Sequence, residues 1–203
     1  MDYFVTGIDT DSGKTLASAI LCEALNADYW KPVQAGLPSD SDTIRSLTDR
    51  SETIIHPETF VLKTPASPHA AAPLDGVNIQ LDDFKIPSNR SHLIIEGAGG
   101  CLVPLNEENF VIDLAKKFDA QVILVSNFYL GSINHTLLSC EALTARKRKV
   151  SGIIFNGPRN HESERIILKH SGLRCLLHID EEPVVDTEMI IKYSKMLRAS
   201  WNG

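Results

Sequence analysis

The segment at residues 7–15, Gly-Ile-Asp-Thr-Asp-Ser-Gly-Lys-Thr, constrains the fold of this 203-residue chain more than any other feature. An apolar run at residues 3–6 precedes it, and apolar residues at helical spacing follow at residues 15–25. A glycine-rich loop between a strand and a helix is typical of phosphate binding, because its backbone N–H groups point at phosphate oxygens. Five residues, not the usual four, separate Gly7 from Gly13, and Ile8 stands where the first motif glycine is expected. We expect Lys14 to reach the β- and γ-phosphates and Thr15 to bind Mg²⁺; a simple turn before a helix is the alternative.

Strands and helices alternate along the rest of the sequence. The expected strands lie at residues 29–33, 92–96, 121–126, 150–156 and 174–179, and the expected helices at 41–47, 110–118, 132–146, 162–171 and about 187–201. Ser41 and Ser132 are candidate helix caps, and Asp186 or Thr187 caps the last helix. Apolar strands between helices are typical of a mostly parallel sheet covered on both faces. The sequence therefore predicts a three-layer α/β fold of the P-loop NTPase type, with residues 1–203 as a single domain.

The stretch at residues 56–87 interrupts this alternation. It contains five of the ten prolines, namely Pro57, Pro65, Pro68, Pro73 and Pro87. Long loops without secondary structure are uncommon inside compact domains. We therefore expect an excursion at the sheet edge that carries short helices and has no core of its own.

The charge and hydrophobicity of the chain exclude several functional classes. Its net charge is −6, and its dense basic run, at residues 146–149, closes a predicted helix where cations suit the helix dipole. We therefore expect no nucleic-acid partner. No apolar run approaches the ~18 residues of a membrane span, and no signal peptide is visible, so no membrane partner is expected. The cysteines Cys22, Cys101, Cys140 and Cys175 form no CxxC motif, so we expect them to be free thiols. Free thiols in turn favour a cytoplasmic location for the protein.

A carboxylate stands at the end of another predicted strand. Residues 92–100 read His-Leu-Ile-Ile-Glu-Gly-Ala-Gly-Gly, so Glu96 follows an apolar run and precedes a glycine-rich segment. The carboxyl end of a parallel strand is the ligand-binding edge of such a sheet. Glu96 is therefore a candidate Mg²⁺ ligand, and a solvated acid before a turn is the alternative.

Two charged side chains near the second predicted strand could join this site. Lys31 could stabilise charge during phosphoryl transfer, and Asp42 could complete a three-sided Mg²⁺ site with Thr15 and Glu96. By composition alone, a solvated lysine and an ordinary aspartate in the first turn of a helix are the more frequent cases. The hypothesis therefore depends on whether the fold brings these groups together.

Two further segments carry groups suited to ligand binding. Residues 130–135, Leu-Gly-Ser-Ile-Asn-His, begin a predicted helix whose N–H groups could bind a carboxylate. Asn156 ends a predicted strand, where its amide can present a donor and an acceptor to a purine edge. A plain helix cap and a plain turn residue are equally frequent explanations.

These motifs together resemble the dethiobiotin synthetase family. The resemblance rests on F-V-T-G-x-D-T-x-x-G-K-T at residues 4–15, K-P-V-x-x-G at 31–36, S-D at 41–42, S-P-H at 67–69, E-G-A-G-G at 96–100, L-G-x-I-N-H at 130–135 and the late Asn156. The order of the motifs matches, and the five-residue spacing in the loop is the family's own form. Each motif alone is weak, whereas the set is specific.

The resemblance implies an enzyme that closes a ring in 7,8-diaminopelargonic acid (7,8-diaminononanoate) with CO2, ATP and Mg²⁺. One substrate amine would take up CO2 as a carbamate. A carbamate oxygen would then attack the γ-phosphate and give a carbamic–phosphoric anhydride. The second amine would close the ureido ring and release phosphate. The protein would mainly position the reactants and neutralise charge.

The resemblance also assigns roles to individual residues. Lys14 and Lys31 would be catalytic and contact phosphate and developing charge, while Thr15, Asp42 and Glu96 would surround Mg²⁺. The implied ATP-binding residues are Thr10, Asp11, Ser12, Gly13, Lys14, Thr15, Asp42, Glu96, Gly97, Ala98, Gly99 and Asn156. The implied substrate-binding residues are Ala35 and, across a homodimer with shared active sites, Ser132, Ile133 and Asn134 of the partner subunit.

Two features depart from the family pattern. Ala35 stands where a Ser or Thr usually contacts the substrate, and a lost hydroxyl contact costs about 0.5–1.5 kcal/mol. The family's late proline-containing adenosine loop is not matched at residues 179–183, Ile-Asp-Glu-Glu-Pro, so the base preference is left open.

Other P-loop classes fit the sequence less well. Cobyrinic acid amidating ligases usually carry a glutaminase domain, for which 203 residues leave no room. Partitioning and division-site ATPases carry a lysine early in the loop, and residues 8–12 contain none. No Asn-Lys-x-Asp motif of a GTPase follows the late strands. We therefore expect an ATP-dependent ligase.

Overall fold

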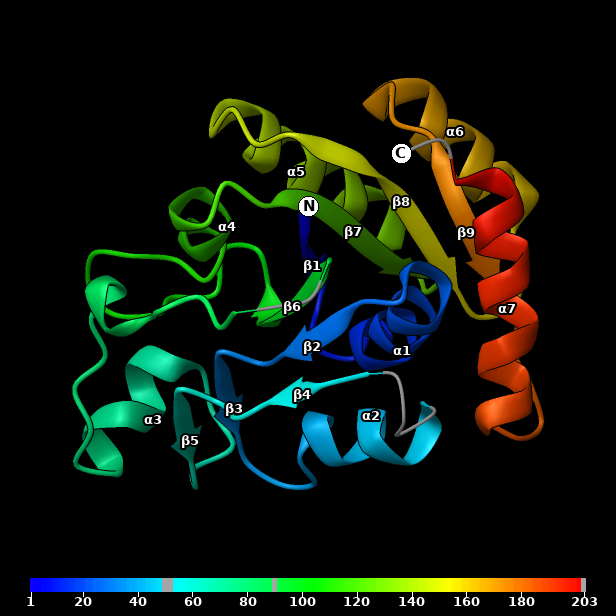
Figure 1. The fold of residues 1–203 in the computed structure, drawn as a ribbon. Helices are drawn as coiled ribbons and strands as arrows, with labels where there is room; N and C mark the ends of the chain where they lie inside the picture. The colour runs from blue at the N-terminus through cyan, green and yellow to red at the C-terminus, as the bar shows by residue number, and fades with distance from the viewer. Residues whose placement is uncertain (49–52, 89–90, 202–203) are drawn as a thin grey trace.

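The centre of the molecule is a seven-stranded sheet (Figure 1). The computed structural model describes residues 1–48, 53–88 and 91–201. Across the sheet, the strands follow the order β4 (Ile55–His56), β2 (Asp28–Trp30), β6 (Leu93–Gly100), β1 (Asp2–Gly7), β7 (Gln121–Asn127), β8 (Val150–Asn156) and β9 (Cys175–Ile179). Each neighbouring pair is parallel. The carboxyl ends of these strands therefore lie at one edge of the sheet.

Helices cover both faces of this sheet. They are α1 (Lys14–Leu25), α2 (Asp40–Leu47), α3 (Pro68–Leu74), α4 (Asp113–Lys117), α5 (Ser132–Ala145), α6 (His161–Ser171) and α7 (Thr187–Ser200). Alternate strand residues point to opposite faces. Accordingly, Tyr3 and Val5 pack with α1, α2 and α7, whereas Phe4 packs with α3, α4 and α5 on the other side. The predicted three-layer α/β fold of the P-loop type is thus confirmed (Figure 1).

The second predicted strand, residues 29–33, is divided in the structure. β2 ends at Trp30, and β3 (Val33–Ala35) pairs instead with β5 (Phe60–Leu62) in a separate two-stranded sheet. Pro32 lies at the break, and because proline has no N–H it cannot continue the hydrogen-bond ladder of a central strand. The break leaves Lys31 just beyond the end of β2.

Several helix ends differ from the sequence prediction. α2 begins at Asp40 with Ser39 at its cap, so Ser41 is not the cap. α5 follows Gly131 in a left-handed conformation (φ 106°), which places Ser132 inside the helix. α4 is shorter than the predicted helix at residues 110–118. For α7, the cap is Asp186, whose side chain accepts a hydrogen bond from the Met189 N–H at 2.9 Å.

The proline-rich stretch packs onto the main body of the protein. It begins at the end of β4 and contains β5, α3 and the short 3₁₀ helix η1 (Leu81–Asp83). Leu62, Ile79 and Phe84 are fully or almost fully buried, in the same cluster as Trp30 of β2 and Leu93 of β6. The prediction that this excursion has no core of its own is therefore confirmed. It extends the core on one face of the sheet.

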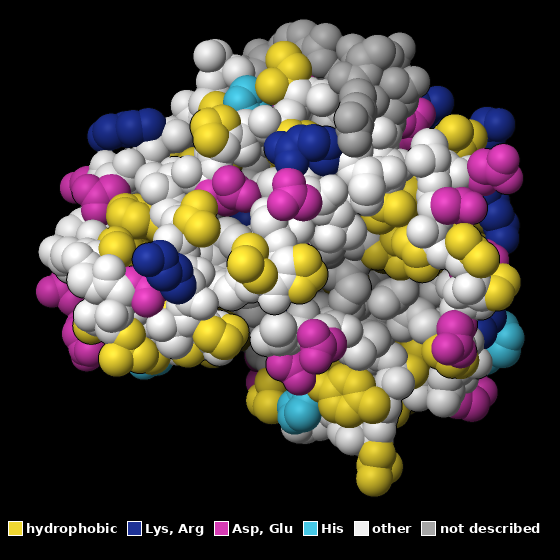
Figure 2. Space-filling model, turned by 90° about the horizontal axis from the view of Figure 1, so that it is seen from below, with side chains coloured by type: hydrophobic (Ala, Val, Ile, Leu, Met, Phe, Trp, Pro, Cys, Tyr) yellow, Lys and Arg dark blue, Asp and Glu magenta, His cyan; other side chains and the backbone are white. Residues whose placement is uncertain are grey.

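The surface of the protein mixes side chains of all kinds. Figure 2 shows lysine and arginine side chains scattered among acidic and hydrophobic ones on the face seen from below. Where its residues are described, that face carries no continuous cationic area (Figure 2). Among the helices that the structure describes, none combines the length and the apolar character that crossing a bilayer requires.

The packing of the excursion gives a first prediction. Phe84 is fully buried and meets the ring of Phe60 edge-on, with centroids 5.3 Å apart. Phe84→Ala should lower the free energy of unfolding by about 3–5 kcal/mol, measured by urea titration. The matched control is Leu74→Ala, because the Leu74 side chain is 73% exposed and its loss should change stability by less than about 0.5 kcal/mol. If both variants changed the free energy of unfolding by the same small amount, the excursion would unfold independently of the sheet.

Candidate active site

The loop between β1 and α1 has the tight backbone that a phosphate-binding loop requires. A Cβ atom on Gly7 would come within 2.1 Å of the Ser12 hydroxyl, and one on Gly13 within 2.2 Å of the Asn156 side-chain nitrogen. Gly13 also has a φ of 91°, which favours glycine. The Ser12 hydroxyl donates to the Asp9 carbonyl at 3.0 Å and closes the loop from inside. No other residue fits at either glycine position.

The Lys14 side chain bonds back to the backbone of the same loop. The Nζ atom donates to the Asp9 carbonyl at 2.9 Å and to the Thr10 carbonyl at 2.7 Å, and the residue is 5% exposed. Burial lowers the pKa of this ammonium, the nearby charge of Lys31 lowers it further, and the result is about 8. The predicted phosphate-binding lysine therefore lies against the loop, and a phosphate could replace the two carbonyl oxygens as its hydrogen-bond partners.

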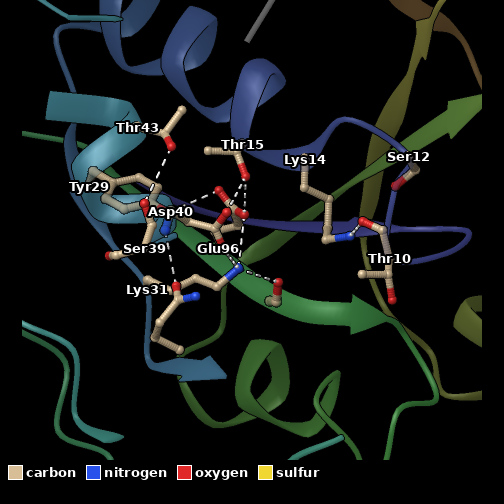
Figure 3. Close-up of polar contacts among 12 residues, drawn as sticks. Thr10, Ser12, Lys14, Thr15, Tyr29, Lys31, Ser39, Asp40, Thr43 and Glu96 are labelled. Atoms are coloured by element: carbon tan, nitrogen blue, oxygen red, sulfur yellow. Dashed lines mark hydrogen bonds and ion pairs between the residues drawn. The ribbon is translucent and has the colours of Figure 1, made fainter. Parts of the chain in front are cut away.

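A compact group of oxygen atoms lies beside this loop, at the carboxyl edge of the sheet (Figure 3). The Thr15 hydroxyl is 2.8 Å from Asp40 Oδ1 and 3.0 Å from Glu96 Oε1. Glu96 is 1% exposed, while the Asp40 side chain is 30% exposed. Thr15 comes from α1, Asp40 from α2 and Glu96 from β6, so three elements far apart in the sequence meet at one point.

Lys31 is the cation of this group. Trp30 pairs with Ile95 in the register of β2 and β6, so the next residues along, Lys31 and Glu96, also lie side by side. Lys31 Nζ is 2.9 Å from Glu96 Oε1 and 2.7 Å from Asp40 Oδ2, and it is 4% exposed. Burial alone would lower its pKa, but the attraction of Glu96 and Asp40 outweighs burial and raises the pKa above the usual lysine value. Lys31 is therefore fully charged.

The structure places Asp40, and not Asp42, at this centre. The Asp42 carboxylate is 73% exposed and pairs with Arg45 on the outer face of α2, so it is not brought together with Thr15 and Glu96. Asp40 lies on the inner side of the helix start. Burial would raise its pKa, but the charge and hydrogen bond of Lys31 bring the pKa below the usual aspartate value. The sequence offers both aspartates as candidates, because the dipeptide Ser-Asp occurs twice, at residues 39–40 and at 41–42.

Two buried side chains that the sequence analysis did not select support the carboxylates. The Tyr29 hydroxyl donates to Glu96 Oε2 at 3.0 Å, and burial, reinforced by the charge of Glu96, raises its pKa well above the usual value. The Gln34 side chain accepts from the Asp40 backbone N–H at 3.1 Å and fixes the start of α2. Tyr29 could have been predicted from its spacing to Lys31, because residues 29 and 31 point to the same side of an extended chain.

The donor set fits a magnesium ion. A hydroxyl and two carboxylates are hard oxygen ligands, and Mg²⁺ is usually held by one or two carboxylates together with phosphate oxygens and water. Among the described residues, no group of three or more His, Cys, Asp and Glu side chains that could hold a metal ion is found. The hydroxyl and the two carboxylates would therefore bind Mg²⁺ together with phosphate oxygens and water.

A cavity of about 700 Å³ opens between the loop, the oxygen group and the proline-rich excursion. It is lined by Thr10, Asp11, Gly13, Lys14, Thr15, Lys31, Ala35, Asp40, Ser67, Glu96, Ala98 and Gly99, among others. Of the predicted nucleotide-binding residues, Ser12, Gly97, Asn156 and Asp42 do not line it. Ser12 is buried inside the loop, and the Asn156 side chain donates to the Ser12 carbonyl at 3.2 Å from below.

The predicted carboxylate-binding segment lies apart from this cavity. Ser132, Ile133 and Asn134 form the first turn of α5 and do not line it. Instead, α5 borders a second hollow of about 460 Å³, whose walls include His135 and Leu138 as well as Ile8, Asp9 and Thr10 of the loop. α5 and the loop therefore meet across this second hollow.

Comparisons with known proteins place this geometry in a family. The AAA domain family matches residues 1–189. The ATP-dependent dethiobiotin synthetase BioD of Cytophaga hutchinsonii is 58% identical over 201 residues, which cover 98% of each chain. The protein of the same name from Christiangramia forsetii is 46% identical over 198 residues, covering 97% of this chain and 95% of that protein.

Solved structures share the fold at much lower identity. MinD from Aquifex aeolicus superposes with a TM-score of 0.57 at 13% identity, covering 98% of this chain and 97% of its own. A ParA family ATPase from Chlorobium tepidum gives a TM-score of 0.54 at 15% identity over 100% and 93% of the two chains. These similarities concern the fold alone. The identity to the curated relatives extends along almost the whole sequence, and the chain therefore belongs to the dethiobiotin synthetase family of ATP-dependent ligases.

Proposed function

We propose that this enzyme makes dethiobiotin from 7,8-diaminopelargonic acid, CO2 (or bicarbonate) and ATP, through a carbamate and a carbamic–phosphoric anhydride. In the first step an amine nitrogen bonds to CO2 and loses a proton. A carbamate oxygen then attacks the γ-phosphorus, and ADP leaves. Finally the second amine attacks the carbamate carbon and loses a proton, and phosphate leaves as the ring closes. The single observation that carries the proposal is Lys31, buried and charged beside a phosphate-binding loop.

In this proposal Lys14 and Lys31 provide most of the positive charge that stabilises the reacting phosphate. Negative charge develops on the transferred phosphoryl group and on the leaving phosphate, and fixed cations stabilise such charge in a site shielded from water. Lys14 can exchange its bonds to the Asp9 and Thr10 carbonyls for phosphate oxygens. Lys31 lies on the other side of the Thr15 hydroxyl, held by Asp40 and Glu96.

A magnesium ion would be held by Thr15, Asp40 and Glu96, and Asp40 thereby replaces Asp42 in the proposed set. When bound, Mg²⁺ neutralises charge on the nucleotide phosphates and orients them. The chain's own contribution is to fix the ligands. Tyr29 holds one Glu96 oxygen, and Gln34 holds the backbone of Asp40.

The remaining nucleotide contacts come from backbone and loop atoms. We propose that ATP lies along the loop, against the segment after Glu96, with Asn156 supporting the loop near the base. The proposed residues are Thr10, Asp11, Ser12, Gly13, Lys14, Thr15, Gly97, Ala98, Gly99 and Asn156. Since Asn156 packs directly beneath Gly13, it also determines the position of the loop.

The substrate is proposed to lie between two subunits of a homodimer. Its diamine end would lie in the cavity beside Lys31 and Ala35, and its carboxylate would meet the backbone of Ser132, Ile133 and Asn134 of the partner subunit. The surface beside that helix start includes several exposed hydrophobic side chains as well as polar ones. Its exposed hydrophobic side chains are Leu102, Tyr129, Leu130, Ile133 and Leu138, with Leu130 wholly exposed. We further propose that residues 1–203 act as one domain in the cytoplasm, where the thiols of Cys22, Cys101, Cys140 and Cys175 stay reduced.

The proposed reaction is tested by the substrate dependence of phosphate release. With Mg²⁺ and ATP, phosphate release should require both diaminopelargonate and bicarbonate, and dethiobiotin should form in equal amount by mass spectrometry. Lys14→Ala should abolish both signals, because the loop then lacks its phosphate-binding charge. Rapid phosphate release from ATP and Mg²⁺ alone would contradict the proposal and favour an ATPase.

The two aspartates of α2 provide a matched pair for the metal site. Asp40→Asn should raise the Mg²⁺ concentration for half-maximal activity by about tenfold or more, because it removes a charge beside Thr15 and Glu96. Asp42→Asn removes the same charge from an exposed position and should leave the Mg²⁺ titration unchanged. If Asp42→Asn shifted the Mg²⁺ titration and Asp40→Asn did not, Asp42 and not Asp40 would belong to the metal site.

The shared site is tested by mixing two inactive variants. Lys14→Ala damages the loop, and Ile133→Pro removes one amide at the second position of α5, where a helix tolerates proline. Each variant should be inactive or weak alone. After mixing, heterodimers should regain activity, because one of their two composite sites takes both parts from undamaged chains.

The control for this mixture is Ile133→Ala. It shortens the same partly exposed side chain but keeps the amide, so it should stay active by itself. Native mass spectrometry would confirm that heterodimers have formed. Heterodimers without recovered activity would show that each site is built from one chain.

A further inference from the structure

The two oxygens of the Glu96 side chain have different partners. Oε1 is 2.9 Å from Lys31 Nζ and accepts from the Thr15 hydroxyl at 3.0 Å, so it belongs to the group of oxygen atoms beside the loop. Oε2 instead accepts from the Tyr29 hydroxyl at 3.0 Å (Figure 3). Glu96 is 1% exposed, so both oxygens depend on protein groups for their partners. The protein therefore controls which oxygen a ligand in the cavity can meet.

Tyr29 is held in place independently of Glu96. β2 lies between β4 and β6, and Tyr29 pairs with Ile55 on one side and Ile94 on the other. Its backbone N–H donates to the Ile54 carbonyl at 2.9 Å. The side chain is fully buried, in the core cluster that also contains apolar residues of β1, α1 and α7. Backbone and ring are thus both fixed, and the hydroxyl stays in one position.

Asp40 is divided between two partners in the same way. Its Oδ1 accepts from the Thr15 hydroxyl at 2.8 Å, while its Oδ2 is 2.7 Å from Lys31 Nζ. In each carboxylate, therefore, one oxygen contacts Thr15 and the second is bonded to a side chain of the segment at residues 29–31. The two carboxylates together offer the site two oxygens and not four.

The number of oxygens that a carboxylate offers distinguishes divalent cations. Ca²⁺ takes about 6–8 oxygen ligands in flexible geometry and often binds both oxygens of one carboxylate. Mg²⁺ is smaller, requires nearly octahedral geometry and keeps several waters, so one oxygen from each of one or two carboxylates suffices. A site whose second carboxylate oxygens are already bonded suits Mg²⁺ better than Ca²⁺.

We propose that Tyr29 is a specificity-determining residue for the metal: by bonding Glu96 Oε2, it limits Glu96 to one oxygen and favours Mg²⁺ over Ca²⁺. The inference rests on the proposed function, in which Thr15, Asp40 and Glu96 hold the ion. A neutral hydroxyl suits this role, because it binds the second oxygen without adding a charge that repels the cation. Tyr29 does not line the cavity, so it acts through Glu96 and not on the nucleotide.

The first test measures ADP binding by isothermal titration calorimetry, once with Mg²⁺ and once with Ca²⁺. Tyr29→Phe keeps the buried ring but removes the hydroxyl, so Glu96 Oε2 becomes free to turn toward the cation. Relative to the unmodified protein, the ADP dissociation constant with Ca²⁺ divided by that with Mg²⁺ should fall by about tenfold. This ratio is the readout, because a general loosening of the site weakens both complexes alike.

The matched control is a second buried tyrosine. Tyr193 of α7 is 1% exposed, and its hydroxyl likewise donates to a glutamate, Glu182, at 2.7 Å. Tyr193 and Glu182 do not line the cavity. Tyr193→Phe therefore removes the same kind of hydrogen bond away from the ion, and the ratio should equal that of the unmodified protein. An equal fall of the ratio in both variants would contradict a role that depends on Glu96.

The second test does not depend on a variant that folds. In a crystal structure of the unmodified protein with Mg²⁺ and ADP, the Tyr29 hydroxyl should remain about 3.0 Å from Glu96 Oε2, with Oε1 as the oxygen on the side of the ion. Glu96 bound to Mg²⁺ through both oxygens, or a Tyr29 hydroxyl displaced from Oε2, would overturn the proposal.

The outcomes separate this inference from the proposed function. If the unmodified protein binds ADP with neither cation, the proposed nucleotide site is wrong. If Mg²⁺ and ADP bind but the ion does not lie beside Thr15 and Glu96, the proposed metal ligands are wrong and the selectivity role falls with them. If the ion lies there and Tyr29→Phe keeps the ratio of the unmodified protein, the selectivity role is wrong while the metal site stands.

Discussion

The site depends on the contacts of one buried ammonium group. Lys31 is almost fully enclosed, and burying a charge is costly unless it is paired. Glu96 and Asp40 provide that pairing, and each is in turn held by a neutral group, Tyr29 or Gln34. Removing Lys31 would leave the buried Glu96 carboxylate and the partly buried Asp40 carboxylate without their shared cation. The cluster therefore behaves as a unit, and its members are coupled more strongly than their separate contacts suggest.

Local patterns predicted the layers of this protein but not every position at its edge. The loop at residues 7–15 and the apolar strands indicated a parallel sheet, because their periodicity reflects burial on both faces. The division of β2 and β3 followed from Pro32, whose missing N–H outweighed a continuous apolar run. The exchange of Asp42 for Asp40 has a different cause. A shift of two residues rotates a helical side chain by more than half a turn, and the sequence alone does not fix where α2 begins.

The fold and the chemistry of this protein have different origins. A division-site ATPase and a partitioning ATPase share the fold at 13% and 15% identity, so the fold does not determine what is made. The distinguishing groups lie on connections that leave the sheet. Lys31 follows the end of β2, Asp40 begins a short helix, and the excursion at residues 56–87 closes the cavity above them.

The position of β1 at the centre of the sheet has a consequence for the order of events during synthesis. The loop follows β1 directly, whereas both neighbours of β1 come from residues 93–127, which are synthesised later. Asn156, which supports the loop, follows Ser12 by 144 positions. At about 5–20 residues per second, this interval lasts about 7–30 seconds. During that time the loop lacks its contact with Asn156, so its support from the end of β8 is complete only after residue 156 has been synthesised.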